Sequence, residues 1–168
     1  MIEIVQAATP HHLDAVRALM RAFVAWHRER HVADIALIDK YFDAADFEAE
    51  LAGLPGKYAP PKGRLLLATH TRQPAGCVAL RDLGDGVCEM KRMFVPAHLR
   101  GLGVGRALGE RLLGEAKTAG HRRMRLDTSI RQAEAAGLYE SMGFRRIEPY
   151  YPLPDDVKSW LVFMELRL

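Results

Sequence analysis

The chain has 168 residues, enough for one compact domain whose core needs neither a structural metal nor disulfide bonds. Hydrophobic residues make up 49% and charged residues 27% of the sequence, a mixture that is typical of globular proteins and excludes a disordered chain. The net charge of +3 suits an anionic ligand but is too small for a dedicated nucleic-acid binder. The apolar run at the N-terminus is short and charges interrupt every later one, so we expect a cytoplasmic protein without a membrane span.

The first third of the chain predicts a strand and two helices. Residues Ile2–Ala7 alternate weakly between apolar and polar and predict a short strand. Thr9 is typical of a helix N-cap, and a proline follows it at the first helical position. Apolar residues then recur at helical spacing to about Arg30, and a second helix is predicted over Ala44–Leu51.

The rest of the chain predicts a hairpin followed by alternating helices and strands. Three strands are expected over Arg64–His70, Ala75–Arg81 and Cys88–Val95, with a tight turn between the last two. The later elements are a helix over Gly105–Ala119, a strand over Arg123–Thr128, a helix over Gln132–Met142, and strands over Phe144–Tyr150 and Trp160–Arg167. This order indicates one mixed α/β domain over the whole chain, without a repeat or a linker.

The two cysteines lie on adjacent strands of the predicted hairpin. If the turn sets the register, Cys88 faces roughly Arg81, which is four residues from Cys77. At about 3.3 Å per residue, that offset separates the two cysteines by more than the ~7 Å that a disulfide can bridge. We therefore expect two reduced thiols.

A glycine-rich stretch just before a predicted helix indicates an anion site. Gly101, Gly103 and Gly105 allow a ligand to approach the backbone closely. The unpaired N–H groups of the first helical turn point outward at the positive end of the helix dipole. Together these features favour a phosphate or pyrophosphate ligand, without saying which molecule carries it.

Two common phosphate-binding patterns fit this sequence poorly. A P-loop needs G-x-x-x-x-G-K-[ST], but Gly56-Lys57 is followed by Tyr58. The dinucleotide pattern G-x-G-x-x-G fails at its third glycine, where Arg106 follows Gly103. Five residues also separate the strand from the glycines, whereas a dinucleotide fold needs a tight turn there.

A third pattern fits throughout. Arg100-x-x-Gly103-x-Gly105 resembles the R/Q-x-x-G-x-G/A pyrophosphate loop of the GCN5-related N-acetyltransferase (GNAT) family. About thirty residues later, the segment 136–144 (AGLYESMGF) resembles the second signature of that family, a helix that carries L-Y-E and is closed by G-F. The resemblance runs from about Cys77 to the end of this segment.

The resemblance implies a single-domain α/β fold with flanking helices and a mixed central sheet. In that family the sheet splays open between its fourth and fifth strands, here Cys88–Val95 and Arg123–Thr128. The pantetheine arm of acetyl-coenzyme A lies in the gap. The resemblance also implies acetyl-CoA as cosubstrate, no metal, and direct attack by a primary amine of a small molecule or peptide in a ternary complex.

The resemblance also implies which residues hold the coenzyme. Pantetheine amides pair with the backbone near the end of the fourth strand, and the pyrophosphate lies on the N–H groups of residues 102–106. Gln132 stands where the family often has asparagine, seven residues before the helix tyrosine. The implied coenzyme-binding residues are Met93, Val95, Arg100, Gly101, Leu102, Gly103, Val104, Gly105, Arg106 and Gln132.

Two residues are candidates for acid–base catalysis. Tyr139 matches the usual acid that protonates the leaving thiolate in the family, and the alternative is a tyrosine that only packs its helix against the sheet. Glu89 lies eleven residues before the loop arginine, a spacing that resembles the general base of the histone-acetylating branch. Strand alternation predicts that Glu89, Lys91, Met93 and Val95 share one largely buried face. An ion pair between Glu89 and a neighbouring cation, and deprotonation through ordered water, remain alternatives.

Other features favour no second activity. His27 and His31 lack a third metal ligand and predict a polar helix end. The basic run at residues 121–125 lacks interleaved aromatic residues, which argues against nucleic-acid binding. A coenzyme-A-binding regulatory module without turnover and a nucleotide-binding protein remain alternative functions. The identity of the acceptor and the oligomeric state, with a homodimer as one option, are left open.

Overall fold

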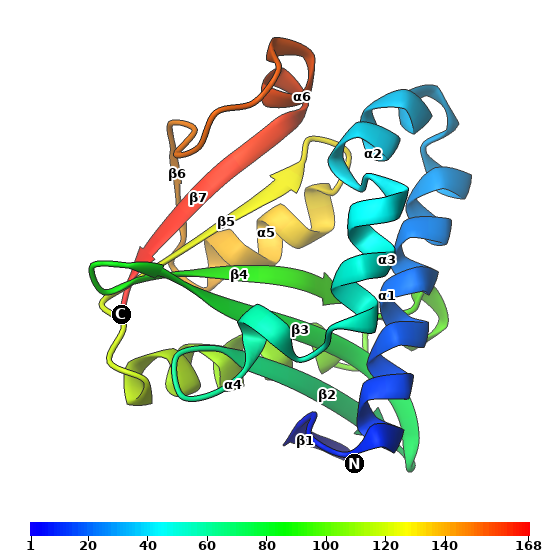
Figure 1. The fold of residues 1–168 in the computed structure, drawn as a ribbon, viewed down its shortest axis with the longest axis vertical. Coiled ribbons are helices and arrows are strands. Elements are labelled where there is room, and N and C mark those ends of the chain that lie inside the picture. The colour runs from blue at the N-terminus through cyan, green and yellow to red at the C-terminus, as the bar shows by residue number, and fades with distance from the viewer.

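A seven-stranded sheet forms the centre of the protein (Figure 1), seen here in a computed structural model that describes residues 1–168. The strands are arranged in the order β1-β2-β3-β4-β5-β7-β6, and β4 and β5 form the only parallel pair. Their bounds are β1 Ile2–Gln6, β2 Arg64–His70, β3 Gln73–Gly84, β4 Val87–Phe94, β5 Arg123–Ser129, β6 Arg145–Ile147 and β7 Leu161–Arg167. The predicted mixed α/β fold is therefore confirmed.

Helices cover both faces of this sheet and bury a separate core cluster on each. Helices α1, α2 and α3 contribute to one cluster, and α4 and α5 to the other. The bounds are α1 Pro10–Arg30, α2 Ile35–Tyr41, α3 Ala44–Ala52, α4 Val104–Thr118, α5 Ala133–Ser141 and α6 Asp155–Trp160. None of these helices has both the length and the apolar composition that crossing a membrane requires.

Local capping explains where two predicted helices begin. The Thr9 hydroxyl accepts a hydrogen bond from the His12 N–H at 3.2 Å, and α1 starts at the next residue. The Asp43 carboxylate does the same for the Asp46 N–H at 3.0 Å at the start of α3. The short helices α2 and α6 were not predicted, because six or seven residues show too little periodicity.

The fourth and fifth strands separate after a short stretch of pairing. Only Val87–Glu89 of β4 pairs with Arg123–Arg125 of β5. Beyond these residues the two strands diverge toward their C-terminal ends, as Figure 1 shows. The splayed sheet that the family resemblance implied is present.

A bulge at Arg92 overturns one prediction about β4. Arg92 has φ +59°, and the pairing with β3 shifts by one residue between Lys91 and Phe94. As a result, Met93 and Val95 pack with the cluster under α4, whereas Phe94 joins the cluster under α1. The prediction that Glu89, Lys91, Met93 and Val95 share one face is therefore wrong, because the extra residue reverses the alternation.

The cysteines are unpaired, as predicted, although the register differs by one residue. Cys88 pairs with Asp82 rather than with Arg81, and Cys77 lies opposite Phe94. Both thiols are free and buried. Burial raises the pKa of each to about 12, so neither provides a thiolate at neutral pH.

We predict that the close approach of β3 to the bulge tolerates no side chain at Gly76. An added Cβ would lie 2.9 Å from the Phe94 carbonyl oxygen and 3.0 Å from Leu108 Cδ1. Gly76→Ala should therefore lower the free energy of unfolding by about 1–3 kcal/mol, measured by urea denaturation. The control Gly114→Ala lies on an exposed part of α4 with nothing within 4 Å and should be stabilising by about 0.5–1 kcal/mol. A Gly76→Ala protein as stable as the wild type would contradict this packing.

Candidate active site

A cleft of about 510 Å³ runs along the glycine loop and the C-terminal end of β4. Nine of the ten predicted coenzyme-binding residues line it, and the tenth, Leu102, is half exposed and does not. Its lining includes Arg30, Arg100, Arg106 and Arg131, with Glu134 as the one carboxylate. The structure thus brings the sequence-predicted residues together in a positively charged groove, which we call the glycine-loop cleft.

The glycines give this loop a backbone that other residues adopt rarely. Gly101 and Gly103 have φ of +84° and +83°, and Gly103 is the N-cap of α4. The Gly103 carbonyl already accepts the Ala107 N–H at 3.0 Å, so the helix begins immediately after it. The first-turn N–H groups have no partner within the helix and form an anion site at its positive end.

Two arginines beside the loop are held by the protein itself. The Arg100 Nε donates to the Val95 carbonyl at 3.1 Å, and its guanidinium lies 4.3 Å from the centre of the Trp26 ring. Arg106 donates to the Ser141 hydroxyl at 2.8 Å. Both side chains therefore keep positive charge beside the helix terminus.

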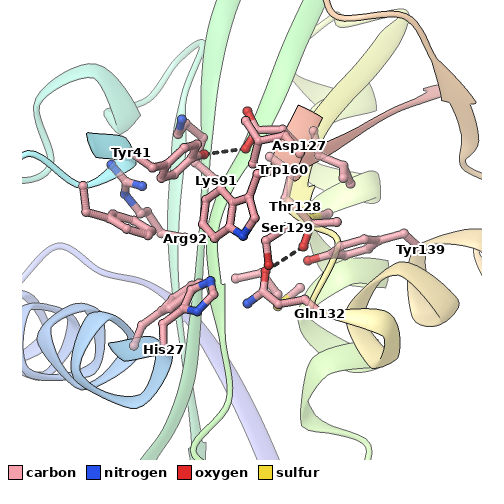
Figure 2. A pocket seen from close by; sticks show the side chains of 16 residues that line it. His27, Tyr41, Lys91, Arg92, Asp127, Thr128, Ser129, Gln132, Tyr139 and Trp160 are labelled. Atoms are coloured by element: carbon pink, nitrogen blue, oxygen red, sulfur yellow. Dashed lines mark hydrogen bonds between the residues drawn. The ribbon is translucent and has the colours of Figure 1, made fainter. Parts of the chain in front are cut away.

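A second, much smaller pocket of about 50 Å³ lies in the gap between β4 and β5, and we call it the inner pocket (Figure 2). Met93, Gln132 and Tyr139 line both this pocket and the glycine-loop cleft, so the two spaces adjoin. The other residues of its lining are Phe23, His27, Tyr41, Phe42, Met90, Lys91, Arg92, Leu126, Asp127, Thr128, Ser129, Trp160 and Leu161. Aromatic rings form much of its wall, and the polar groups come mainly from β4 and β5.

Tyr139 lies at the junction of these two spaces. Its ring packs edge-on against Phe144, with the centroids 5.9 Å apart, and Figure 2 shows its hydroxyl directed toward β5. Burial, together with the charge of Asp127, raises the pKa of the phenol above its usual value. The hydroxyl therefore remains protonated at neutral pH.

Glu89 lines none of these spaces. Its carboxylate accepts hydrogen bonds from Arg81 at 2.7 Å and from the Tyr150 hydroxyl at 2.6 Å, and Lys91 Nζ lies 3.7 Å away. Burial alone would raise its pKa, but Lys91, Tyr150 and Arg81 outweigh burial and the pKa is lowered. The ion pair that was the alternative to a catalytic base is thus present, and the role as base stays a prediction.

Asp127 is a residue whose importance the sequence did not reveal. Its two carboxylate oxygens accept one phenol each, from Tyr41 and from Tyr151, the latter at 2.6 Å. Only its place at the end of a strand beside the predicted gap was visible in the sequence. The tyrosines that position it lie far away in the chain.

A third space, the outer cleft, opens on the side of α2 and α3 and holds about 490 Å³. Tyr41, Phe42 and Arg92 line both the outer cleft and the inner pocket. Arg92 forms two hydrogen bonds with Glu50, at 2.9 and 3.2 Å, and Lys57 lies 3.1 Å from the same carboxylate. Burial opposes the ionised form of Glu50, but the two cations lower its pKa to about 2.

Gln132 and His27 line the inner pocket, whereas His31 lines the glycine-loop cleft. The Thr128 hydroxyl donates to Gln132 Oε1 at 2.6 Å, which orients the amide at the start of α5. His27 stacks on Phe23 with the centroids 6.0 Å apart, and burial and the neighbouring His31 lower its pKa to about 4. His27 is therefore neutral at physiological pH.

Comparisons with known proteins agree on one family. Residues 61–146, about half the chain, match the family profile for the acetyltransferase (GNAT) domain. An uncharacterized N-acetyltransferase of Schizosaccharomyces pombe is 39% identical over 123 residues, which cover 71% of this chain and 72% of that protein. The N-acetylaspartate synthetase of Danio rerio is 33% identical over 137 residues, covering 78% of this chain and 48% of that protein.

Solved structures share the fold at low sequence identity. An acetyltransferase from Streptococcus agalactiae superposes with a TM-score of 0.74 at 22% identity and covers 99% of this chain and 98% of its own. The PaiA N-acetyltransferase from Thermoplasma acidophilum, solved in complex with coenzyme A, has a TM-score of 0.74 at 15% identity and covers 100% and 99%. From the profile, the relatives and the shared fold, we conclude that this chain belongs to the GNAT acetyltransferase family and is an N-acetyltransferase.

Proposed function

We propose that the protein transfers the acetyl group of acetyl-CoA to a primary amine by direct attack within a ternary complex. The observation that supports this proposal is the continuity of the three spaces across the gap in the sheet. Met93 and Tyr139 connect the glycine-loop cleft to the inner pocket, and Arg92 connects the inner pocket to the outer cleft. A donor that enters from one side and an acceptor that enters from the other meet beside Tyr139.

The glycine-loop cleft suits the coenzyme. The pyrophosphate would lie on the first-turn N–H groups of α4, between Arg100 and Arg106. Beyond Glu89, the edge of β4 has no strand partner on the β5 side, so backbone groups near Met93 and Val95 are free to pair with pantetheine amides. A protein of the same fold has been solved with coenzyme A.

Direct attack needs no acyl carrier on the protein. Both cysteines are buried outside the three spaces and are protonated, so neither is suited to accept the acetyl group. The neutral amine attacks the carbonyl carbon, the C–N bond forms and the C–S bond breaks. The Tyr139 hydroxyl then gives its proton to the leaving thiolate and is reprotonated by the proton that the new amide nitrogen releases.

The overall proposal is tested by incubating the protein with isotopically labelled acetyl-CoA and a panel of amines, followed by mass spectrometry. We expect at least one acetylated amine, and acetyl-CoA at 100 times its Kd should stabilise the protein by about 2.7 kcal/mol. NAD and ATP at the same concentration should stabilise it less. Binding of acetyl-CoA without acetylation of any amine would favour a regulatory module instead.

Gly103→Val tests the coenzyme site. The positive φ at this position disfavours a β-branched residue, and the side chain would obstruct the approach of the pyrophosphate. We expect acetyl-CoA affinity, measured by calorimetry, to fall about tenfold or more while the fold survives. Gly114→Val, which is on the same helix and away from the loop, is the matched control and should bind normally. An undiminished acetyl-CoA affinity in folded Gly103→Val would show that the loop is not part of the coenzyme site.

Tyr139→Phe tests the general acid. The substitution keeps the ring and its packing on Phe144 and removes only the hydroxyl. Because the coenzyme thiolate is already a fairly good leaving group, the turnover number should fall by about 10², the low end for acid–base catalysis. Thermal stability and acetyl-CoA affinity serve as internal controls and should change little. Wild-type turnover, under conditions where chemistry limits the rate, would leave Tyr139 with a packing role only.

Glu89→Gln separates an ion-pair role from a catalytic one. Removing the charge leaves Lys91 and Arg81 without their buried partner, so we expect a loss of stability of about 3–5 kcal/mol. If Glu89 is also the general base, the rate per folded molecule should fall mainly at low pH, while acetyl-CoA affinity stays nearly unchanged. An unchanged rate and pH profile would leave Glu89 with the ion-pair role alone.

A further inference from the structure

The glycine-loop cleft has a second wall that the glycine motif does not provide. Trp26, Arg30 and His31, at the C-terminal end of α1, line this cleft together with the loop and α5. None of the three was among the predicted coenzyme-binding residues, and all of them lie before residue 61, where the match to the family profile begins. The cleft is therefore completed by a part of the chain that lies outside the matched segment.

Other aromatic rings fix the ring of Trp26 at the end of β4. Its centroid lies 6.4 Å from that of Phe94, the last residue of β4, and 5.7 Å from that of His31, which meets it edge-on at 84°. Phe94 stacks in turn on Phe23 at 5.3 Å, so the row of rings continues into the core under α1. An indole that is packed in this way offers a fixed surface to the side chain that lies on it.

Arg100 lies on this surface with the face of its guanidinium and keeps most of its N–H groups free. The guanidinium carbon is 4.3 Å from the centre of the Trp26 ring, and Nε donates to the Val95 carbonyl at 3.1 Å. A guanidinium is planar, and its five N–H groups point outward in that plane. The contact with the indole therefore leaves the four N–H groups of the terminal nitrogens able to bind an oxyanion.

Glu134 indicates on which side these free N–H groups lie. Its carboxylate lines the glycine-loop cleft and is 3.9 Å from Arg100 Nη1. The Glu134 side chain is fully accessible to solvent on most of its surface, so this ion pair contributes little to stability. A pyrophosphate that forms charge-assisted hydrogen bonds to the terminal nitrogens would replace it. The free edge of the Arg100 guanidinium thus faces the cleft.

We propose that Trp26 is a positioning residue for the coenzyme, because it stacks on Arg100 and holds the terminal N–H groups of that guanidinium toward the pyrophosphate. This inference rests on the proposed function and adds a contribution of α1 to the donor site. Without the indole, one carbonyl and one exposed carboxylate would hold Arg100, and coenzyme binding would have to order a flexible side chain. Trp26 therefore affects the binding of acetyl-CoA and not the transfer step.

Calorimetry with acetyl-CoA is the first test, on wild type, Trp26→Leu and Trp26→Phe. Trp26→Leu removes the ring face, and we expect its Kd for acetyl-CoA to rise about fivefold, the value of one cation–π contact near the surface. Trp26→Phe keeps a ring in this place and should stay within about twofold of the wild-type Kd. An equal Kd for folded Trp26→Leu and wild type would overturn the proposal.

A double-mutant cycle shows whether Trp26 acts through Arg100. Arg100→Gln should raise the Kd about tenfold or more, because hydrogen bonds to a charged group are lost. In that background Trp26→Leu should add less than about twofold, since the contact is already absent. A full fivefold effect of Trp26→Leu in the Arg100→Gln protein would contradict the proposal. The control Arg111→Gln removes an arginine of α4 that lies outside the cleft and should leave the Kd within about twofold.

A truncated donor separates positioning from a general loss of structure. S-acetylpantetheine lacks the pyrophosphate, so its kcat/KM should be the same in Trp26→Leu and wild type. The KM for acetyl-CoA should rise about fivefold in the same variant, with an unchanged kcat. Equal losses with both donors would mean that the indole contacts the pantetheine arm or only supports the fold, and the proposal would be wrong.

Arg100→Lys keeps the proposal testable if Trp26→Leu does not fold. Lysine retains the positive charge but has no planar group to stack on the indole. We expect Arg100→Lys to lose most of the affinity that Arg100→Gln loses, and a wild-type Kd would rule out the positioning role. A wild-type protein that binds no acetyl-CoA would contradict the proposed function itself. That failure is distinct from tight binding that survives Trp26→Leu.

Discussion

The short pairing between β4 and β5 is the constraint on which the rest of the structure depends. Three residue pairs hold the strands together, and beyond Glu89 and Arg125 they separate. A bulge bends the strand that carries it, and the bulge at Arg92 lies where β4 has already left β5. The same bulge directs Met93 toward α4, while Lys91 faces Tyr41 on the other side of the sheet.

Buried charges around the gap follow one rule. A buried charge is costly unless another charge or several hydrogen bonds compensate it. Glu89 is compensated by Arg81 and Lys91, and Glu50 by Arg92. Asp127 accepts hydrogen bonds from two phenols, and its charge acts on Lys91, as that of Glu89 does. These three carboxylates are thus compensated within the protein.

The segment that matches the family profile covers the glycine-loop cleft more fully than the outer cleft. The family profile covers residues 61–146, which include the glycine loop, β4, β5 and α5. All residues of the outer cleft except Arg92 lie before residue 61, in α2, α3 and the turn that follows them. The part of the chain that would recognise the acceptor thus lies largely outside the matched segment. Relatives that share the matched segment can therefore differ in the acceptor that they use.

The sequence by itself predicted most of the elements and the residues that line the glycine-loop cleft, because caps, alternation and a glycine loop depend on residues a few positions apart. Thr9 caps α1 as predicted and the loop glycines directly precede α4, while α2 needed the packing of Ile38 into the core and left no periodic pattern. The environment of Asp127 was decided only by the tertiary structure. Tyr41 and Tyr151 lie 86 and 24 residues away from it in sequence, and contacts at such separations leave no local pattern in a single chain.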